Sequence, residues 1–179
     1  MLKATPDMAD TLPGAELAAA LPRLRRYARV LTRDVHRADD LVQDTLARAW
    51  EKRHLWRLGS DLRAWLFAIM HNLHVNQIAM RRRDTACVSL DDEEAGHGAN
   101  IPVVDAQFNC VAVAEVTAHL AALPFEQREV LVLAAVEELS YAEIARVLGI
   151  PGGTVMSRLS RARDKLRRSV AKGAVPGAR

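Results

Sequence analysis

The stretch Leu139–Arg168 reads LSYAEIARVLGIPGGTVMSRLSRARDKLRR and decides the fold. Ser140 precedes an apolar periodic run and Glu143 follows three residues later, the pattern of a capping box that starts a helix. Gly149 predicts the end of this short helix, because glycine accepts the left-handed conformation that follows a last turn. A proline and two glycines come next, and Thr154 is the expected N-cap of a second helix. The pattern is therefore a helix, a tight turn and a helix.

The expected second helix has an apolar stripe and a basic opposite face. The stripe consists of Val155, Leu159, Ala162 and Leu166. Between Arg158 and Arg168, six residues are basic and one is acidic. Two short helices with arginines near the start of the second are typical of a helix-turn-helix, whose second helix enters the major groove of DNA. The alternative is a helical pair that docks a protein, with the arginines as a solvated face.

Charge is distributed unevenly along the 179 residues, although the formal net charge is only +3. No Lys or Arg occurs between Arg83 and Arg128, and four consecutive acids occupy positions 91–94. Half of the residues are apolar but only 4% are aromatic, so Leu, Val and Ala must form the core. Ala, Leu, Arg and Glu dominate and few β-branched alternating runs occur, which predicts an almost entirely helical chain. Two basic lobes around an acidic connector indicate a nucleic-acid partner.

The fold class predicted from these patterns is all-α, with two small helical domains joined by a flexible linker. Segments without periodicity, with proline, glycine or clustered acids, mark the tails and the linker. The expected divisions are a disordered N-terminal tail over 1–14, a first lobe over 15–83, an acidic flexible linker over 84–106, a second lobe over 107–172 and a tail over 173–179.

Several function classes lack their sequence signatures. Cys87 and Cys110 are too few and too scattered for a disulfide framework or a four-ligand metal site. Neither a secretory leader nor an apolar run of membrane-spanning length occurs. The phosphate-binding, dinucleotide-binding and zinc-protease motifs are missing, and the histidines complete no metal site. We therefore expect a cytoplasmic protein that is not an enzyme, uses no cofactor or metal, takes no small-molecule substrate and does not insert into membranes.

Three helices are expected in the first lobe. The helical pattern of the first begins at Ala15. Pro22 is unfavourable inside a helix but tolerated in a first turn, so the helix itself is expected to start at Pro22. The second runs from about His36 to Arg53, with Leu41, Thr45, Ala49 and Trp50 on one face. The third is capped by Ser60 and ends in three consecutive arginines.

Polar residues of these helices leave two interpretations open. Asp39, Asp40 and Asp44 near the start of the second helix complement its dipole, or form a docking surface for a basic partner. On the third helix, amide and imidazole side chains cluster before the arginines. They are ordinary surface residues, or they read the bases of a single strand while the arginines contact phosphates.

These residues resemble a known family. The segments 39–45 (DDLVQDT), 48–50 (RAW), 62–66 (LRAWL) and 72–73 (NL), followed by a basic run, resemble conserved region 2 of extracytoplasmic-function sigma factors, group 4 of the sigma-70 family. The segments 123–124 (LP), 140–145 (SYAEIA), 149–151 (GIP), 153–155 (GTV) and 157–163 (SRLSRAR), with Arg128, resemble region 4.

The resemblance implies an alternative sigma factor that binds core RNA polymerase and recognises the −10 and −35 promoter elements, under control of a cognate anti-sigma factor. The implied contacts with the β′ clamp are Asp39, Asp40, Gln43, Asp44, Arg48 and Trp50. The implied −10 contacts are Trp65, His71, Asn72, His74, Asn76, Arg81, Arg82 and Arg83. The implied −35 contacts, in a lobe that also touches the β flap, are Tyr141, Thr154, Ser157, Arg158, Ser160, Arg161, Arg163 and Lys165.

Two other functions remain open at this point. One is a sigma-like decoy or adaptor that binds an anti-sigma protein, although such a mimic would not need the arginine-rich helix. The other is a stand-alone helix-turn-helix repressor, whose first lobe would serve dimerisation or sensing and whose operator would be palindromic.

Overall fold

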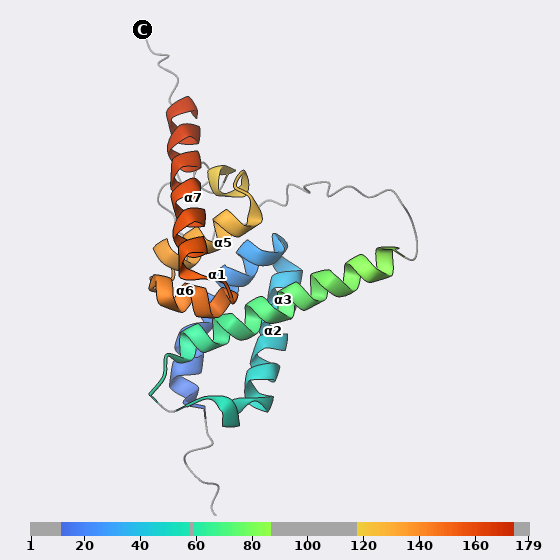
Figure 1. Ribbon diagram of the computed structural model, residues 1–179. Coiled ribbons are helices and arrows are strands. Elements are labelled where there is room, and N and C mark those ends of the chain that lie inside the picture. Colours follow the sequence, from blue (N-terminus) through green and yellow to red (C-terminus); the bar gives the residue numbers. More distant parts are fainter. Residues whose placement is uncertain (1–11, 58, 87–117, 174–179) are drawn as a thin grey trace, which may run out of the picture.

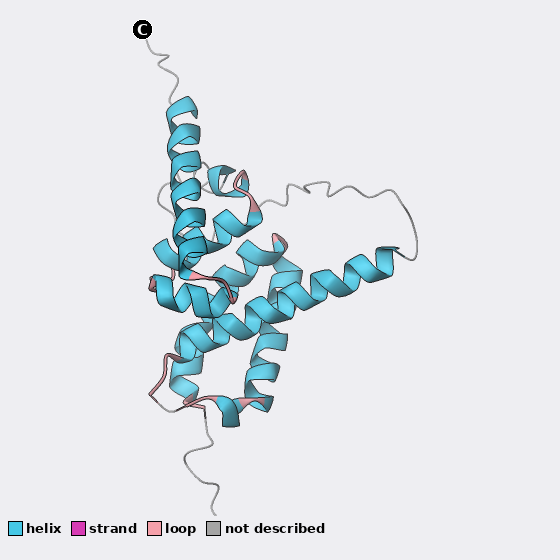
Figure 2. Ribbon diagram, in the orientation of Figure 1, coloured by secondary structure: helices cyan, strands magenta, loops and turns pink. Residues whose placement is uncertain are grey.

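The computed structural model describes residues 12–57, 59–86 and 118–173, and within these ranges the chain forms helices and turns without a strand (Figure 2). The first lobe consists of α1 (Gly14–Thr32), α2 (Val35–Glu51), the short 3-10 helix η2 (Arg53–Leu55) and α3 (Leu62–Ala86). The second consists of α5 (Phe125–Ala135), α6 (Tyr141–Leu148) and α7 (Gly152–Gly173), preceded by helical residues 118–121. The predicted all-α class is confirmed. Most of the predicted tails and linker lies outside the described residues.

Pro22 lies inside α1, so the prediction that it marks the start of the helix is wrong. Proline has no N–H to donate to the carbonyl four residues earlier, which weakens the helix at this point. The ring is exposed, and the buried stripe continues on both sides of it with Ala20 and Leu24. Packing of this stripe against α2 and α3 offsets the missing hydrogen bond.

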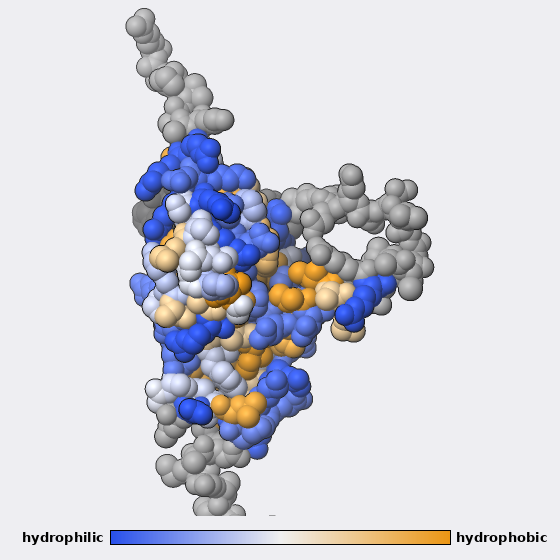
Figure 3. Space-filling model, viewed as in Figure 1, coloured by the Kyte–Doolittle hydropathy of each residue, from blue (hydrophilic) through white to orange (hydrophobic). Residues whose placement is uncertain are grey.

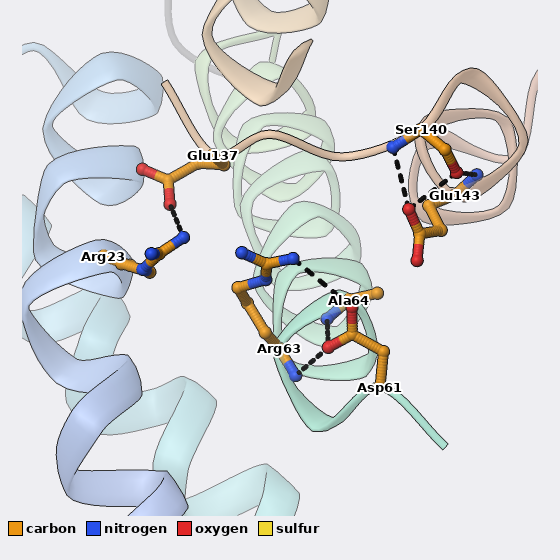
Figure 4. A network of polar contacts seen from close by, with 7 residues as sticks. All are labelled: Arg23, Asp61, Arg63, Ala64, Glu137, Ser140 and Glu143. Atoms are coloured by element: carbon orange, nitrogen blue, oxygen red, sulfur yellow. Dashed lines mark hydrogen bonds and ion pairs between the residues drawn. The ribbon is translucent and has the colours of Figure 1, made fainter. Parts of the chain in front are cut away.

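The start of α3 is set by Asp61, and the prediction of Ser60 as its cap is wrong. Asp61 Oδ1 accepts from the backbone N–H groups of Arg63 at 2.9 Å and Ala64 at 3.2 Å (Figure 4). The Ser60 hydroxyl instead donates to the carbonyl of Arg57 at 2.7 Å. A carboxylate is the stronger acceptor for the free N–H groups of a first turn. At its other end α3 continues to Ala86, beyond the expected last residue, Arg83.

The start and end of α6 are as predicted. The Ser140 hydroxyl accepts from the N–H of Glu143, whose carboxylate accepts in return from the Ser140 N–H at 2.8 Å (Figure 4). Gly149 ends the helix with φ 63°. The prediction of Thr154 as the next cap is wrong, because α7 begins at Gly152 and Thr154 donates its N–H to the carbonyl of Pro151 at 2.9 Å. Helical glycine costs about 1 kcal/mol, which burial of the α7 stripe offsets.

The two lobes pack against each other, which the sequence did not indicate. In Figure 1, α3 runs diagonally across α1 and α2, and α5, α6 and α7 lie above it. The lobes meet where α3 contacts α6 and where α1 contacts α5. Within the second lobe, α7 packs on α5 and α6, and its C-terminal part extends away from the rest of the molecule.

Candidate functional site

The basic face of α7 is open to solvent. Val155, Leu159 and Ala162 are buried, which confirms the predicted stripe. The predicted −35 residues are all on α6 or α7: Tyr141, Ser157, Ser160, Arg161, Arg163 and Lys165 are exposed, and Thr154 and Arg158 are half-buried. Figure 3 shows a strongly hydrophilic surface over the outer part of α7. The helix therefore offers arginine, serine and lysine side chains to a ligand, while its apolar side holds it to the lobe.

The predicted polymerase-binding residues share the outer surface of α2. Asp39, Asp40, Gln43, Asp44, Arg48 and Trp50 are all exposed. Asp39 lies 3.9 Å from Arg25 Nε, Gln77 donates to Asp44 Oδ2 at 3.1 Å, and Arg48 donates to Glu51 Oε2 at 2.9 Å. Exposed ion pairs of this kind contribute little to stability. This acidic surface is therefore free to take basic groups from another molecule.

The prediction that Trp50 shares the buried face of Leu41, Thr45 and Ala49 is wrong, because 56% of Trp50 is exposed. Arg53 lies over its ring, with the guanidinium carbon 5.2 Å from the ring centroid. Trp50 therefore adds an exposed aromatic side chain to the α2 residues, and Leu55 of the following η2 is also 59% exposed.

The predicted −10 residues of α3 divide into two groups. Asn72, Asn76, Arg81 and Arg83 are exposed, Trp65 is half-buried, and nothing is described of the Arg82 side chain. His71 and His74 instead meet the second lobe: 7% of His74 is exposed, and its ring lies 5.9 Å from that of Phe125. Hydrophobic surface also runs along the outer half of α3 (Figure 3), where Val75 and Met80 are exposed.

Glu129 of α5 is a buried polar centre between the lobes, with 2% of the residue exposed. Its Oε1 accepts from the Tyr27 hydroxyl at 2.7 Å and contacts His71 Nδ1 at 2.8 Å. Burial, followed by the charge of Glu129, raises the pKa of Tyr27 well above its ordinary value. Burial lowers the pKa of His74 below its ordinary value, outweighing the opposite effect of Glu129. Tyr27 therefore remains a donor, and the neutral form of His74 is favoured.

Glu137, in the turn after α5, makes the second polar contact between lobes. It is fully buried, and its Oε1 accepts from Arg26 Nε at 2.8 Å. Arg23 approaches the other oxygen at 3.8 Å, a distance beyond hydrogen bonding (Figure 4). These two contacts join α1 to the turn after α5 and so help to fix how the lobes meet.

Glu129 and Glu137 were not identified from the sequence. The sequence did contain a hint of them. Both acids lie in a strongly apolar segment, residues 129–137, whose pattern predicts burial. Their partners lie more than 50 residues away in the sequence, so the pairs could not be assigned. Among the described helices, none combines the length and hydropathy that crossing a bilayer requires.

Comparison with known proteins agrees with this geometry. Residues 17–71 match the family described as the sigma2 domain of PhyR, and residues 114–166 match sigma-70, region 4. The ECF RNA polymerase sigma factor EcfG of Rhodopseudomonas palustris is 37% identical over 84% of this chain and 81% of its own length. SigL of Mycobacterium tuberculosis, also named an ECF RNA polymerase sigma factor, is 34% identical over 80% of this chain and 80% of its own length.

A solved structure extends the likeness to both lobes. The sigma factor RpoE of Bartonella quintana, crystallised with the anti-sigma factor NepR, is 33% identical and superposes with a TM-score of 0.76. The match covers 88% of this chain and 96% of that one. Together with the exposed basic helix of the second lobe, these relatives show that the chain belongs to the ECF family of sigma factors.

Proposed function

We propose that this chain binds core RNA polymerase and directs it to promoters by recognising −10 and −35 elements. The observation that carries the proposal is the exposed basic face of α7, on a helix-turn-helix that the region 4 match covers. Such a helix reads base edges in the major groove and neutralises phosphates with its remaining cations. The protein is then a cytoplasmic specificity subunit and not itself an enzyme.

The −35 assignment is tested by replacing Arg158 and Arg161 singly with alanine. An arginine that reads a guanine contributes on the order of 1–3 kcal/mol, so −35-dependent binding should weaken roughly 5- to 150-fold. Arg161 is exposed and Arg158 is half-buried, and neither belongs to the buried stripe of α7, so circular dichroism should show an unchanged fold. Arg57→Ala, an exposed arginine of the first lobe, is the matched control. Unchanged run-off transcription in both α7 variants would refute the assignment.

The acidic surface of α2 is proposed to hold the β′ clamp. Asp44→Lys and Gln43→Lys should weaken binding to core polymerase, while binding of the full chain to −35 DNA alone stays as in the wild type. Glu16→Lys changes an exposed acid on α1 and is the matched control. Equal retention of Asp44→Lys, Gln43→Lys and Glu16→Lys on immobilised core enzyme would remove this surface from the proposal.

We further propose that an anti-sigma factor stabilises the packed arrangement of the lobes. The supporting observations are the covered His71 and His74 and the likeness to a sigma factor crystallised with its anti-sigma factor. If these histidines contact the −10 element, the lobes must separate first. A cross-link that holds α1 to α5 should therefore abolish promoter melting but leave −35 binding intact.

A sigma-like decoy is the second candidate function, because the first lobe matches the sigma2 domain of PhyR. Such a protein would bind an anti-sigma factor without engaging polymerase. Mixing the purified chain with core polymerase and promoter DNA separates the candidates. Promoter-specific transcripts support a sigma factor, whereas their absence together with tight anti-sigma binding supports the decoy.

A further inference from the structure

A groove of about 340 Å³ lies between the start of α6 and the neighbouring side of α7. Tyr141 lines it from α6, and the residues that line it from α7 include Met156, Ser160, Arg163 and Arg167. Successive spacings of four, three and four residues place these four side chains in one row along α7. The row is distinct from the buried stripe of the helix, so the groove belongs to its open surface.

Met156 is the apolar member of this row, and 55% of it is exposed. One turn before it is Gly153 and one turn after it is Ser160, and both are exposed. A Cβ atom at Gly153 would contact none of the described atoms within 4 Å, so the space on that side is open. Because its neighbours in the row are short, the long Met156 side chain protrudes from the helix surface.

The place of Met156 on α7 gives this exposure a meaning. A single exposed methionine on an ordinary surface needs no explanation. Met156, however, follows the first residue of α7, Gly152, by only four positions. In a helix-turn-helix the N-terminal residues of the second helix reach the base edges of the major groove. Met156 is therefore in the part of the chain that meets bases, although it is not among the predicted −35 contacts.

A protruding apolar side chain has one apolar counterpart on the base edges of the major groove. The four base pairs present hydrogen-bond donors and acceptors there, and thymine alone adds a methyl group, at C5. The methionine side chain is unbranched and polarizable, so it adapts its shape to such a contact. The exposed hydroxyl groups of Ser157 and Ser160 beside it remain available for hydrogen bonds to neighbouring bases or phosphates.

We propose that Met156 is a specificity-determining residue, whose side chain contacts the C5-methyl group of a thymine in the −35 element. The inference rests on the proposed function, because it requires the start of α7 to enter the major groove. It goes beyond that function by naming a base and the chemical group by which this chain recognises it.

The surroundings of Met156 suit DNA better than a protein partner. Arg163 and Arg167 line the same groove, and Asp164, the acid that also lines it, pairs with Arg167 at 3.3 Å. Asp164 is eight residues from Met156, about 12 Å along the helix axis, so it does not meet the same base. Stable protein interfaces bury about 1,000 Å² or more around a cluster of apolar side chains, which one methionine beside Tyr141 does not supply.

Removal of a single methyl group from DNA tests the proposal. The wild-type full-length chain first selects its preferred duplexes from a random pool, and each thymine of a selected duplex is then replaced singly by deoxyuridine, which lacks only the C5-methyl group. Fluorescence anisotropy measures the affinity for each duplex. At one thymine, the replacement should weaken binding by the wild type roughly fourfold, the effect of losing one buried methyl contact.

Met156→Ala should bind the thymine duplex and its deoxyuridine copy equally well, because the side chain that contacts the methyl group is gone. Val170→Ala is the matched control, since Val170 is also an apolar residue of α7 and 54% of it is exposed, but it lies near the other end of the helix. This variant should keep the roughly fourfold preference for thymine.

Distinct outcomes separate this inference from the proposed function. If the wild type selects no duplex, both are overturned. If it selects duplexes that contain no thymine, or whose deoxyuridine copies all bind equally well, only the role of Met156 is overturned. The same holds if Met156→Ala keeps the preference for the methyl group. Weaker retention of that variant on immobilised core polymerase, with the preference unchanged, would assign Met156 to a protein contact instead.

Discussion

Tyr27→Phe is the smallest change that weakens the contact between the lobes. The Tyr27 hydroxyl donates to Glu129 Oε1 at 2.7 Å, and its ring packs edge-on against Phe67 with the centroids 5.1 Å apart. Phenylalanine retains the ring contact and removes only the hydrogen bond. A hydrogen bond to a charged group contributes about 1.5–3 kcal/mol, so the ratio of separated to packed lobes should rise roughly 10- to 150-fold.

Energy transfer between the lobes measures this ratio. Dyes are attached to cysteines introduced at Arg57 and Arg168, both exposed, in a chain whose Cys87 and Cys110 are replaced by serine. Transfer efficiency is recorded at increasing urea, and the separation of the lobes should occur at lower urea in Tyr27→Phe than in the wild type. Circular dichroism at the same urea concentrations reports the total helix content, so separation of the lobes is distinguished from unfolding of the helices.

Tyr141→Phe is the matched control, since Tyr141 is the other tyrosine of the chain and is exposed on α6. It should separate at the same urea concentration as the wild type. If Tyr27→Phe and Tyr141→Phe gave the same transfer curve, the buried carboxylate would not hold the lobes together. The lobes would then be held together by other contacts, such as the packing of α3 on α6.

Three further predictions concern caps and titration. Asp61→Ala should reduce the free energy of unfolding by about 1 kcal/mol in a urea titration, and Ser60→Ala by much less, because only Asp61 caps α3. Ser140→Ala should also reduce the free energy of unfolding by about 1 kcal/mol, because it removes the cap of α6. Burial lowers the pKa of His74 below 6.5. As the pH falls, His74 is therefore protonated in the unfolded chain at a higher pH than in the folded chain. The free energy of unfolding should therefore decrease as the pH drops through 6.5, and His74→Gln should reduce this dependence.

Controls for these predictions lie in the same chain. His54→Gln removes an exposed histidine and should leave the pH dependence as in the wild type. A pH dependence unaffected by His74→Gln would contradict the role given to burial. Equal costs for Asp61→Ala and Ser60→Ala would contradict the assignment of the α3 cap.

Local chemistry made much of the helix-turn-helix predictable. Ser140, Glu143 and Gly149 act on neighbours within a few residues, so their roles follow from spacing alone. The apolar stripe of α7 likewise follows from helical periodicity. The errors at Pro22, Ser60 and Thr154 are of another kind. In each case the sequence allowed more than one start for a helix, and a nearby acceptor or the packing of a buried stripe decided between them.

The sequence by itself determined the helical class, the two-lobe order, the basic face of α7 and the acidic surface of α2, because each depends on residues close together in the chain. Only the tertiary structure decided that the lobes touch and that Tyr27 and His71 meet Glu129. These contacts join residues far apart in the sequence. A buried charge can be suspected from the apolar pattern around it, but its partner is set by how whole helices pack.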